Sequence, residues 1–332
     1  MADVSERPGG WKNRVTALFG TAYPILLGPM RLITLGEMAA AVSRSGGLGV
    51  IAASGLSSDR LRAELAQVRE LTDRPVAVNI PVYRPNAFDA LEIAIEMGVK
   101  TIYTSAGSPA KLMPRIREAG LRVLHKVSSL EKAIKAEEAG ADAVVAMGFE
   151  AGGHVGREGI TTFCLIPQLV DTLKIPVVAS GGIADARGVL AALALGAEGV
   201  EVGTRLVATD ECPVPAFFKE RVCAATCEDT LLLGKEAMPI RVLKNRVTAR
   251  VAGMDEAKSD QLIVEAGDAA YVQEGGDRES AVMPCGQAAG LVKRVRPVRE
   301  VIEELVAGTE RISQQMAEFF RWNAQGADDH EP

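Results

Sequence analysis

The segment GFEAGGHVGREG, residues 148–159, contains residue types that can move protons. It places Glu150 and His154 among five glycines, directly after the apolar run ADAVVAMG. An imidazole titrates near neutral pH, so it can remove a proton from an acidic carbon or donate one to an oxygen. Glu150 could orient His154 or raise the pKa of its imidazole, or it could be a loop carboxylate. We expect an acid–base site here, the alternative being a histidine that only stabilises its loop.

Two glycine-rich segments further along the chain are typical of phosphate binding. ASGGIAD contains Ser180, Gly181 and Gly182, and VGTRLVAT contains Gly203 and Thr204. Glycines let backbone N–H groups approach an anion, and the start of the following helix favours negative charge. The alternative is that both segments are tight turns between a strand and a helix. Because both carry the signal, we expect a phosphate group, either from a phosphorylated substrate or from FMN.

Polar residues at other expected strand ends favour FMN. Asn79 and Lys126 supply an amide and an ammonium that could reach the polar edge of a flavin ring. The alternatives are a turn-stabilising asparagine and a lysine that extends to solvent. His125 points away from the site if Lys126 points inward, so we expect a structural role for it. The other residues expected at the cofactor are Gly28, Pro29, Met30, Gly152 and Gly153.

A barrel of alternating strands and helices would bring these residues together. Four segments share a helical stretch that ends in Gly and is followed by an apolar strand: EMGVKTIYTS, EAGLRVLHKV, EAGADAVVAM and ALGAEGVEVG. Gly suits the left-handed position after a helix, and a β-branched run suits a buried parallel strand. Four further strands fit YPILLG, GLGVIAAS, RPVAVNI and IPVVASGG. Eight such units predict an α/β fold, a (β/α)8 TIM barrel with its active site at the carboxyl ends of the strands.

The regular pattern stops after the eighth strand. We predict an FMN-binding barrel from residues 20–211 and 286–310, closed by a long amphipathic helix that begins in GQAAGLVKRV. Residues 212–285 are predicted to form a mainly helical insertion over the barrel mouth. Residues 311–332 are expected to be a C-terminal helix and tail, with His330 inert. The sequence MAEFFRW could pack in the core or form a homodimer contact.

The composition argues against several classes of partner. The 332 residues carry a formal net charge of −6 with acids and bases interspersed, which argues against nucleic-acid binding. No apolar run is long enough for a membrane span and the first twenty residues lack a signal-peptide core, so we expect a cytoplasmic protein without a membrane partner. The five cysteines are scattered and predict no disulfide framework. Cys223 and Cys227 lack a second ligand pair, and we expect buried thiols rather than a metal site.

The sequence resembles the nitronate monooxygenase superfamily of FMN-dependent TIM barrels, which includes type II enoyl-ACP reductases and NAD(P)H:quinone reductases. The resemblance covers nearly the whole chain and is strongest in GEMAAAVSRSGGLGVIAASG, ELTDRPVAVNI, GFEAGGHVG and IPVVASGGIADARGVLAALALGAEGVEVGTRLVATDE. It implies that His154 lies in the active site. The flavin-binding residues that it implies are Gly181, Gly182, Gly203 and Thr204, with Asn79 and Lys126 near the ring.

The resemblance allows two chemistries. In the first, which we prefer, a small-molecule nitronate gives electrons to FMN and reaction with O₂ yields a carbonyl compound and nitrite, with His154 as the base for the neutral nitroalkane. In the second, NAD(P)H reduces FMN, which reduces an enoyl thioester or a quinone. The pair HK at 125–126 is similar to the monooxygenases and quinone reductases, whereas PIRVLKNRV is similar to the enoyl reductases. Leu27 stands where many relatives carry Gln, which removes one polar contact to the flavin.

Two further points stay open at the level of sequence. Arg241, Lys244 and Arg246 could bind the phosphate of an acyl carrier or of CoA, or they could be solvated surface charges. A function of another class, a non-catalytic barrel that only binds flavin or phosphate, predicts that the substitution His154→Ala leaves ligand affinity and turnover unchanged.

Overall fold

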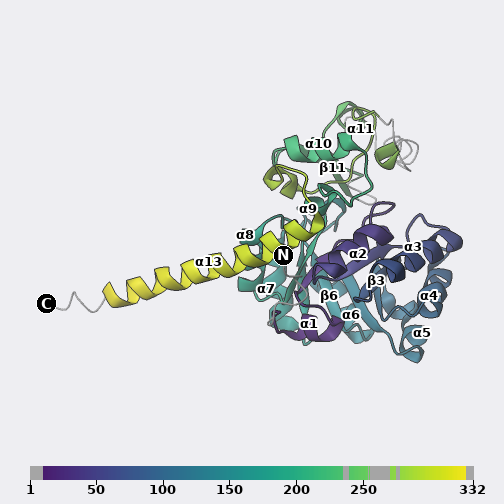
Figure 1. Cartoon of the computed structure of the whole chain (residues 1–332), viewed down its shortest axis with the longest axis horizontal. Helices are drawn as coiled ribbons and strands as arrows, with labels where there is room; N and C mark the ends of the chain where they lie inside the picture. The colour runs from purple at the N-terminus through teal and green to yellow at the C-terminus, as the bar shows by residue number, and fades with distance from the viewer. Residues whose placement is uncertain (1–9, 235–238, 253, 255–269, 274–276, 327–332) are drawn as a thin grey trace.

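The computed structural model describes residues 10–234, 239–252, 254, 270–273 and 277–326, and its centre is a barrel of eight parallel strands (Figure 1). The barrel closes between β1 and β2, where the amide of Leu27 donates to the carbonyl of Leu48 at 3.0 Å. All eight strands predicted from the sequence are present, and the predicted TIM barrel is confirmed. In spatial order the strands are β1 (Ile25–Leu27), β9 (Gly199–Val202), β8 (Val177–Ser180), β6 (Ala143–Met147), β5 (Arg122–Val127), β4 (Thr101–Ser105), β3 (Val76–Pro81) and β2 (Gly49–Ala52).

Helices cover the outside of the barrel, as the apolar periodicity predicts. In α3, Leu61, Leu65 and Val68 are buried against the sheet, whereas the residues on the opposite face are exposed. The helix begins after Ser57, whose hydroxyl accepts a hydrogen bond from the amide of Arg60 at 3.2 Å. The barrel helices are α2 (Gly36–Arg44), α3 (Ser58–Leu71), α4 (Ala87–Glu96), α5 (Met113–Glu118), α6 (Leu130–Glu138), α7 (Thr162–Thr172) and α8 (Ala186–Ala194), with a 3₁₀ turn over Pro109–Lys111.

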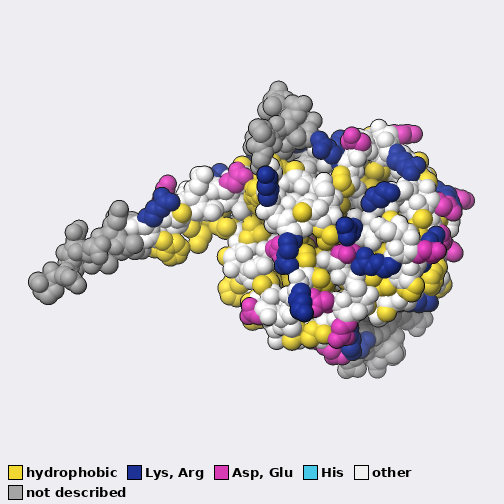
Figure 2. All heavy atoms as spheres, turned by 90° about the horizontal axis from the view of Figure 1, so that it is seen from below, with side chains coloured by type: hydrophobic (Ala, Val, Ile, Leu, Met, Phe, Trp, Pro, Cys, Tyr) yellow, Lys and Arg dark blue, Asp and Glu magenta, His cyan; other side chains and the backbone are white. Residues whose placement is uncertain are grey.

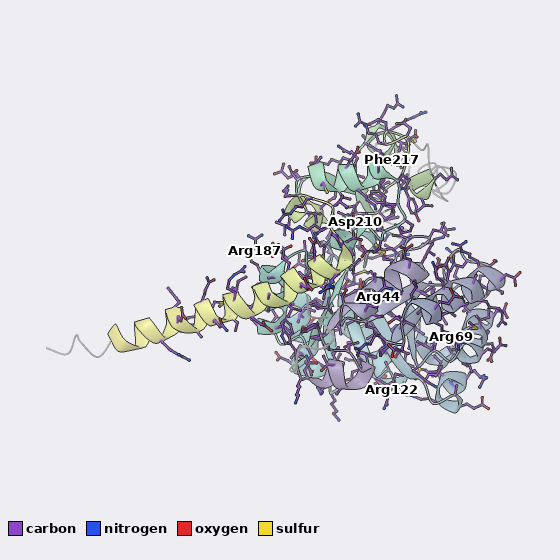
Figure 3. The ribbon with its side chains drawn as sticks, in the orientation of Figure 1. Arg44, Arg69, Arg122, Arg187, Asp210 and Phe217 are labelled. Carbon is purple, nitrogen blue, oxygen red and sulfur yellow. The ribbon has the colours of Figure 1, made fainter. Side chains whose placement is uncertain are left out.

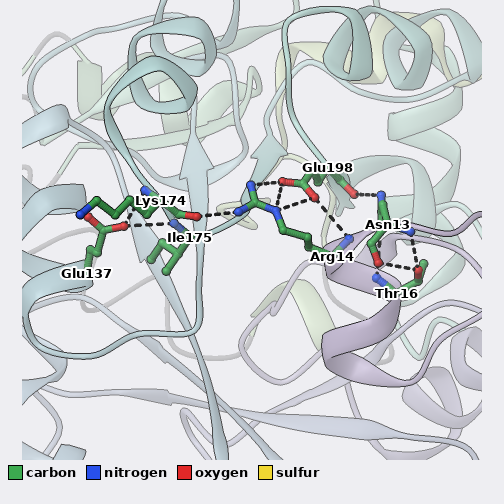
Figure 4. A network of polar contacts seen from close by, with 7 residues as sticks. All are labelled: Asn13, Arg14, Thr16, Glu137, Lys174, Ile175 and Glu198. Atoms are coloured by element: carbon green, nitrogen blue, oxygen red, sulfur yellow. Dashed lines mark hydrogen bonds and ion pairs between the residues drawn. The ribbon is translucent and has the colours of Figure 1, made fainter.

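A polar network holds the amino-terminal helix α1 (Arg14–Phe19) at the end of the barrel where the strands begin (Figure 4). The guanidinium of Arg14 donates from Nε to Glu198 Oε1 at 2.8 Å and from Nη1 to the carbonyl of Lys174 at 2.5 Å. Glu137 accepts from the amide of Lys174 at 2.7 Å. Because these residues precede β8 and β9, the network lies at the end of the barrel opposite the expected active site.

The chain leaves the barrel after α9 (Thr204–Val207) and returns at nearly the same place. Thr209 forms a parallel bridge with Arg296, and the amide of Asp210 donates to the carbonyl of Arg296 at 3.1 Å. Figure 3 shows Asp210 at this junction and Phe217 in the lobe beyond it. The lobe contains α10 (Ala216–Ala224), α11 (Arg246–Ala252) and 3₁₀ turns over Ala270–Val272 and Gln287–Leu291.

The described part of the insertion also contains an antiparallel hairpin that the sequence analysis did not predict. Strand β10 (Thr230–Leu233) pairs with β11 (Ile240–Leu243), and β11 pairs in turn with the short strand β7 (Gly153–His154) of the barrel loop. A small apolar cluster beneath the hairpin explains its position; its buried members are Leu233, Ile240, Val242, Val251 and Val282. Residues 235–238 and 255–269 of the predicted insertion lie outside the described residues.

The last helix, α13 (Val298–Gly326), begins later than the sequence analysis predicted. It starts directly after Pro297, because proline fits the start of a helix but cannot continue one. The expected helical segment from Gly286 is instead a 3₁₀ turn followed by extended chain. The helix runs without a break through residue 310, where the sequence analysis placed a boundary between the barrel and the C-terminal segment.

The second half of α13 projects away from the barrel (Figure 1). Its first half is packed, since Ile302 and Leu305 are buried and Thr309 donates to the carbonyl of Ala186 at 3.4 Å. Further along, Phe319 and Phe320 are each 62% exposed. The expectation that MAEFFRW packs in the core of the same chain is therefore wrong for these two side chains, and the homodimer contact stays a prediction. His330 lies outside the described residues.

The surface carries mixed charge. On the face seen in Figure 2, the side chains of Lys and Arg alternate with those of Asp and Glu, and hydrophobic side chains gather along one side of the projecting helix. Within the described part of the chain, no helix has both the length and the apolar character that crossing a membrane requires.

Candidate active site

His154 lies at the mouth of the barrel on a strand rather than on the flexible loop that the glycines suggested. Residues Gly153 and His154 form β7, and they pair with Arg241 and Ile240 of β11 respectively. The next residue, Val155, donates from its amide to the carbonyl of Pro239 at 2.9 Å. The insertion thereby fixes the backbone of His154, while its side chain stays open to solvent.

The electrostatic surroundings keep the imidazole of His154 neutral. Although the side chain is exposed, the surrounding protein lowers its pKa below the usual 6.5 by making the charged form harder to solvate. The positive charge of Arg84, from the loop after β3, lowers the pKa further. The guanidinium of Arg84 lies over the ring of Tyr83 at 5.0 Å, and its buried Nε has no hydrogen-bond partner among the described residues. The lowered pKa therefore favours the unprotonated form of His154 at neutral pH.

The substitution Arg84→Gln is expected to raise the pKa of His154, because it removes the cation that disfavours a second positive charge nearby. An NMR titration of the imidazole Cε1–H in both proteins measures the shift. Arg157→Gln is a matched control. Arg157 is an exposed arginine three residues after His154, and it is not among the groups that shift the pKa of His154. An unchanged His154 titration in Arg84→Gln would contradict the electrostatic coupling.

Glu150 has a partner other than His154. Its two carboxylate oxygens accept from the amide of Thr162 at 3.1 Å each, so it caps the start of α7. The pKa of His154 is lowered, so the expected upward shift is wrong. The carboxylate instead ties the His154 loop to a barrel helix, which makes Glu150 a structural member of the site.

The insertion also contacts the loop that holds His154, through Arg241. Its Nη2 and Nε donate to the carbonyl of Phe149 at 2.9 and 3.3 Å, and its guanidinium stacks on the Phe149 ring at 5.2 Å. Arg241 is only 5% exposed, so the proposal that it binds an external phosphate is wrong. Lys244 and Arg246 are exposed, and Arg246 lies 3.7 Å from Asp277.

The glycine segments after β8 and β9 present free amides side by side. Gly181 and Gly182 both have positive φ, +102° and +76°, a conformation that turns successive N–H groups to one side. Strands β8 and β9 are neighbours, which places Gly203 and Thr204 next to this turn. Among the described residues, the amides of these four residues have no hydrogen-bond acceptor. Such a group of unpaired donors suits an anion such as a phosphate.

The end of β1 borders this group of amides. The amide of Gly28 donates to the carbonyl of Val202 at 2.9 Å, and a Cβ on Gly28 would lie 3.3 Å from the Cα of Gly203. Pro29 and Met30 follow and are partly exposed. A Cβ on Gly203 would meet only the sulfur of Met30, at 3.9 Å, so the space in front of Gly203 is open to a ligand.

Gly152 and Gly153 have different surroundings. A Cβ on Gly152 would lie 2.5 Å from the amide nitrogen of Gly286, so this glycine lets the returning insertion approach the barrel. The amide of Gly286 also donates to Thr204 Oγ1 at 2.9 Å, which occupies the Thr204 hydroxyl but not its backbone amide. Gly153 has a φ of +71°, and a Cβ there would make only an ordinary contact with Pro284 Cβ at 3.9 Å, so its place at the cofactor stays a prediction.

Beneath the mouth, polar side chains meet in the interior of the barrel. Lys126 on β5 donates to Glu201 Oε1 on β9 at 2.7 Å, and because two strands separate β5 from β9, this contact crosses the barrel. Ser180 donates to the same oxygen at 2.7 Å. Asn79 is buried on β3 and its amide donates to the carbonyl of Tyr103 at 2.9 Å. The structure thus brings the predicted Asn79, Lys126 and Ser180 to one region, and it assigns Asn79 to a strand rather than a turn.

The remaining candidates lie outside this region or are unreactive. His125 is buried on the outer side of the sheet beside the hydroxyl of Thr104, at 2.8 Å, and burial lowers its pKa to about 4. Its expected structural role is confirmed. Cys227 is exposed, so the expectation of a buried thiol is wrong there, whereas burial raises the pKa of the Cys285 thiol to about 12.

Comparison with known proteins identifies the family. A family model described as nitronate monooxygenase matches residues 12–308. The chain belongs to this family. Members of the nitronate monooxygenase family are flavin-dependent, and the protein is an oxidoreductase, as the sequence motifs implied.

Individual members of the nitronate monooxygenase family and solved structures agree with this assignment. A probable nitronate monooxygenase of Staphylococcus saprophyticus is 34% identical over 297 residues, which are 76% of this chain and 84% of that protein. FabK from Thermotoga maritima has a TM-score of 0.89 and 37% identity, covering 93% of this chain and 99% of FabK. A nitroalkane oxidase from Streptomyces ansochromogenes has a TM-score of 0.81 and 29% identity, covering 92% of this chain and 100% of that chain.

Sequence reasoning missed two charged residues that the structure places beside the predicted ones, Arg84 near His154 and Glu201 against Lys126. Glu201 is a lone acid in the apolar strand segment GVEVG, and an acid at such a position is a signal because a buried charge requires a partner. Arg84 lies in the loop segment PVYRPN and carries no comparable local signal, because its relation to His154 arises only in the folded chain.

Proposed function

We propose that the protein oxidises small nitronates and their parent nitroalkanes with FMN as cofactor, giving a carbonyl compound and nitrite. The observation that carries the proposal is a neutral, exposed imidazole, His154, at the mouth of a barrel whose neighbouring strand ends present unpaired amides. The match to the nitronate monooxygenase family over residues 12–308 supports the same reaction.

The residues present fit FMN. The amides of Gly181, Gly182, Gly203 and Thr204 would hold the phosphate, and the open space in front of Gly203 leaves room for its approach. Asn79 and Lys126 would lie toward the polar edge of the ring. Bound FMN would supply the electron acceptor that delivers the substrate's electrons to O₂.

The protein's own residues would carry out the proton chemistry. His154 is unprotonated at neutral pH, so it can take the α-proton of a nitroalkane and leave the nitronate. Because the side chain is exposed, the proton can pass from it to water. The cation of Arg84 lies near the same histidine and favours the anion that forms.

The second candidate function is reduction of an enoyl thioester or a quinone by NAD(P)H through the same FMN. The observation that favours it is the similarity to FabK, at 37% identity and nearly complete coverage of both chains. In that reaction His154 would bind a carbonyl or phosphate group of the substrate.

Flavin analysis and anaerobic mixing test the proposal. We expect the purified protein to be yellow and to release FMN, not FAD, on denaturation. Mixed without oxygen, ethyl nitronate should bleach the flavin rapidly, and NADH or NADPH should not. Bleaching by NADH or NADPH but not by ethyl nitronate would favour the reductase function instead. A colourless protein that does not take up added FMN would refute both reactions.

A further inference from the structure

The carboxylate of Glu201 is the centre of a buried hydrogen-bond network. Glu201 is 4% exposed and accepts hydrogen bonds from three side chains on three other strands. Lys126 Nζ and Ser180 Oγ each donate to Oε1 at 2.7 Å, and the hydroxyl of Tyr103 donates to Oε2. Both carboxylate oxygens are therefore occupied.

Only one of the three donors carries a positive charge. The pKa of Tyr103 is well above its usual value because of burial and the nearby negative charge of Glu201, so the phenol keeps its proton and donates it. The hydroxyl of Ser180 is neutral. Lys126 and Glu201 thus form an ion pair of zero net charge inside the barrel, and each supplies the counter-charge that the other requires.

The network also restricts the long side chain of Lys126. A lysine has four rotatable bonds and loses considerable conformational entropy when it is fixed. Here Nζ lies 2.7 Å from Glu201 and 5.5 Å from the centre of the Tyr103 ring. The side chain of Lys126 is still 17% exposed, so the ion pair with Glu201 does not bury it completely.

We propose that Glu201 is a positioning residue that holds the ammonium of Lys126 in place for the cofactor. The proposal rests on the FMN site described under the proposed function. Glu201 acts through Lys126, so its loss displaces the cation that would stabilise negative charge on the ring. A carboxylate with a purely structural role would affect only the stability of the barrel.

Sulfite binding to the flavin distinguishes these roles, because the adduct places negative charge on the ring. We expect Glu201→Gln to raise the dissociation constant of sulfite about tenfold, an electrostatic effect of about 1.4 kcal/mol. Lys126→Met should raise it at least as much, and Glu201→Gln should cause no further increase in the Lys126→Met background. Removing a negative charge without displacing Lys126 would instead lower the dissociation constant. A lowered or unchanged value in Glu201→Gln, or additive effects in the double variant, would overturn the proposal.

A second measurement needs no flavin, so a failure of the FMN assignment does not affect it. In the apoprotein, acetylation of Lys126 by acetic anhydride, followed by mass spectrometry, reports how well the ion pair protects the amine. We expect Glu201→Gln to increase acetylation of Lys126 several-fold. Thr104→Val is the control, because it removes a buried hydrogen bond, to His125, on the outer side of the same sheet. Equal acetylation in wild type and Glu201→Gln would also overturn the proposal.

Discussion

Turnover of a neutral nitroalkane is expected to fall about 100- to 10,000-fold when His154 is replaced by alanine, which is the usual contribution of a positioned general base. The same variant should keep most of its activity on a preformed nitronate, because that anion has no α-proton to remove. Since β7 pairs with β11 through its backbone, alanine can keep the fold of the segment. Steady-state kinetics with nitroethane and ethyl nitronate under air measure both effects.

The control for this variant is Arg157→Ala, an exposed position three residues further along the same loop. We expect both substrates to be turned over normally by that protein. Equal losses with nitroethane and ethyl nitronate in His154→Ala would contradict the role as base and favour a role in binding. Full activity with both would show that His154 is not required for turnover, whereas a wild-type protein that turns over neither substrate would favour the non-catalytic barrel.

The pH dependence should follow the protonation of the same imidazole. The pKa of His154 in the folded protein is lowered from 6.5, so its neutral form predominates at pH 7 and is lost as the pH falls through the lowered pKa. Turnover of the neutral nitroalkane should therefore decline only on the acidic side. In Arg84→Gln this decline should begin at a higher pH.

The barrel was predictable because its signals are local. In four units a glycine after the helix and an apolar run after the glycine mark strands such as β5 and β6, and the eight-fold repetition of strand and helix leaves few alternatives to a closed barrel. The carboxyl ends of the strands then place Asn79, Lys126, Gly181 and Gly203 on one face. Position at a strand end thus predicts proximity without any knowledge of side-chain contacts.

The surroundings of His154 could not be predicted because they depend on contacts that are distant in the chain. Its strand has only two residues and pairs with Ile240, on a hairpin in the insertion. Neither two residues nor a glycine-rich segment carries a period-2 pattern. For the same reason Glu150 was linked to its near neighbour His154, although its carboxylate caps the helix that begins at Thr162.

The second large expected effect is a loss of FMN affinity when the backbone amides after β8 are displaced. Changing both Gly181 and Gly182 to alanine is expected to weaken FMN binding about 100-fold. Left-handed backbone costs an ordinary residue about 1–2 kcal/mol, and relief of that strain at two positions would turn both amides away from the phosphate. The added methyl groups would also crowd the loop, since a Cβ on Gly182 would lie 3.1 Å from Glu150 Cγ. Titration of the apoprotein with FMN, followed by flavin fluorescence, measures the dissociation constant.

The matched control is Gly98→Ala with Gly120→Ala, because both glycines have similar positive φ values, +65° and +66°. They follow helices α4 and α5 at the opposite end of the barrel, where the strands begin. This variant should lose thermal stability to a similar degree and bind FMN with the affinity of the wild type. If both double variants bound FMN equally well, the phosphate would have to be held elsewhere, because strain alone is common to the two. If only the Gly181 and Gly182 variant loses affinity for FMN, the phosphate is held by the amides of these two residues, which need the left-handed backbone to point toward it.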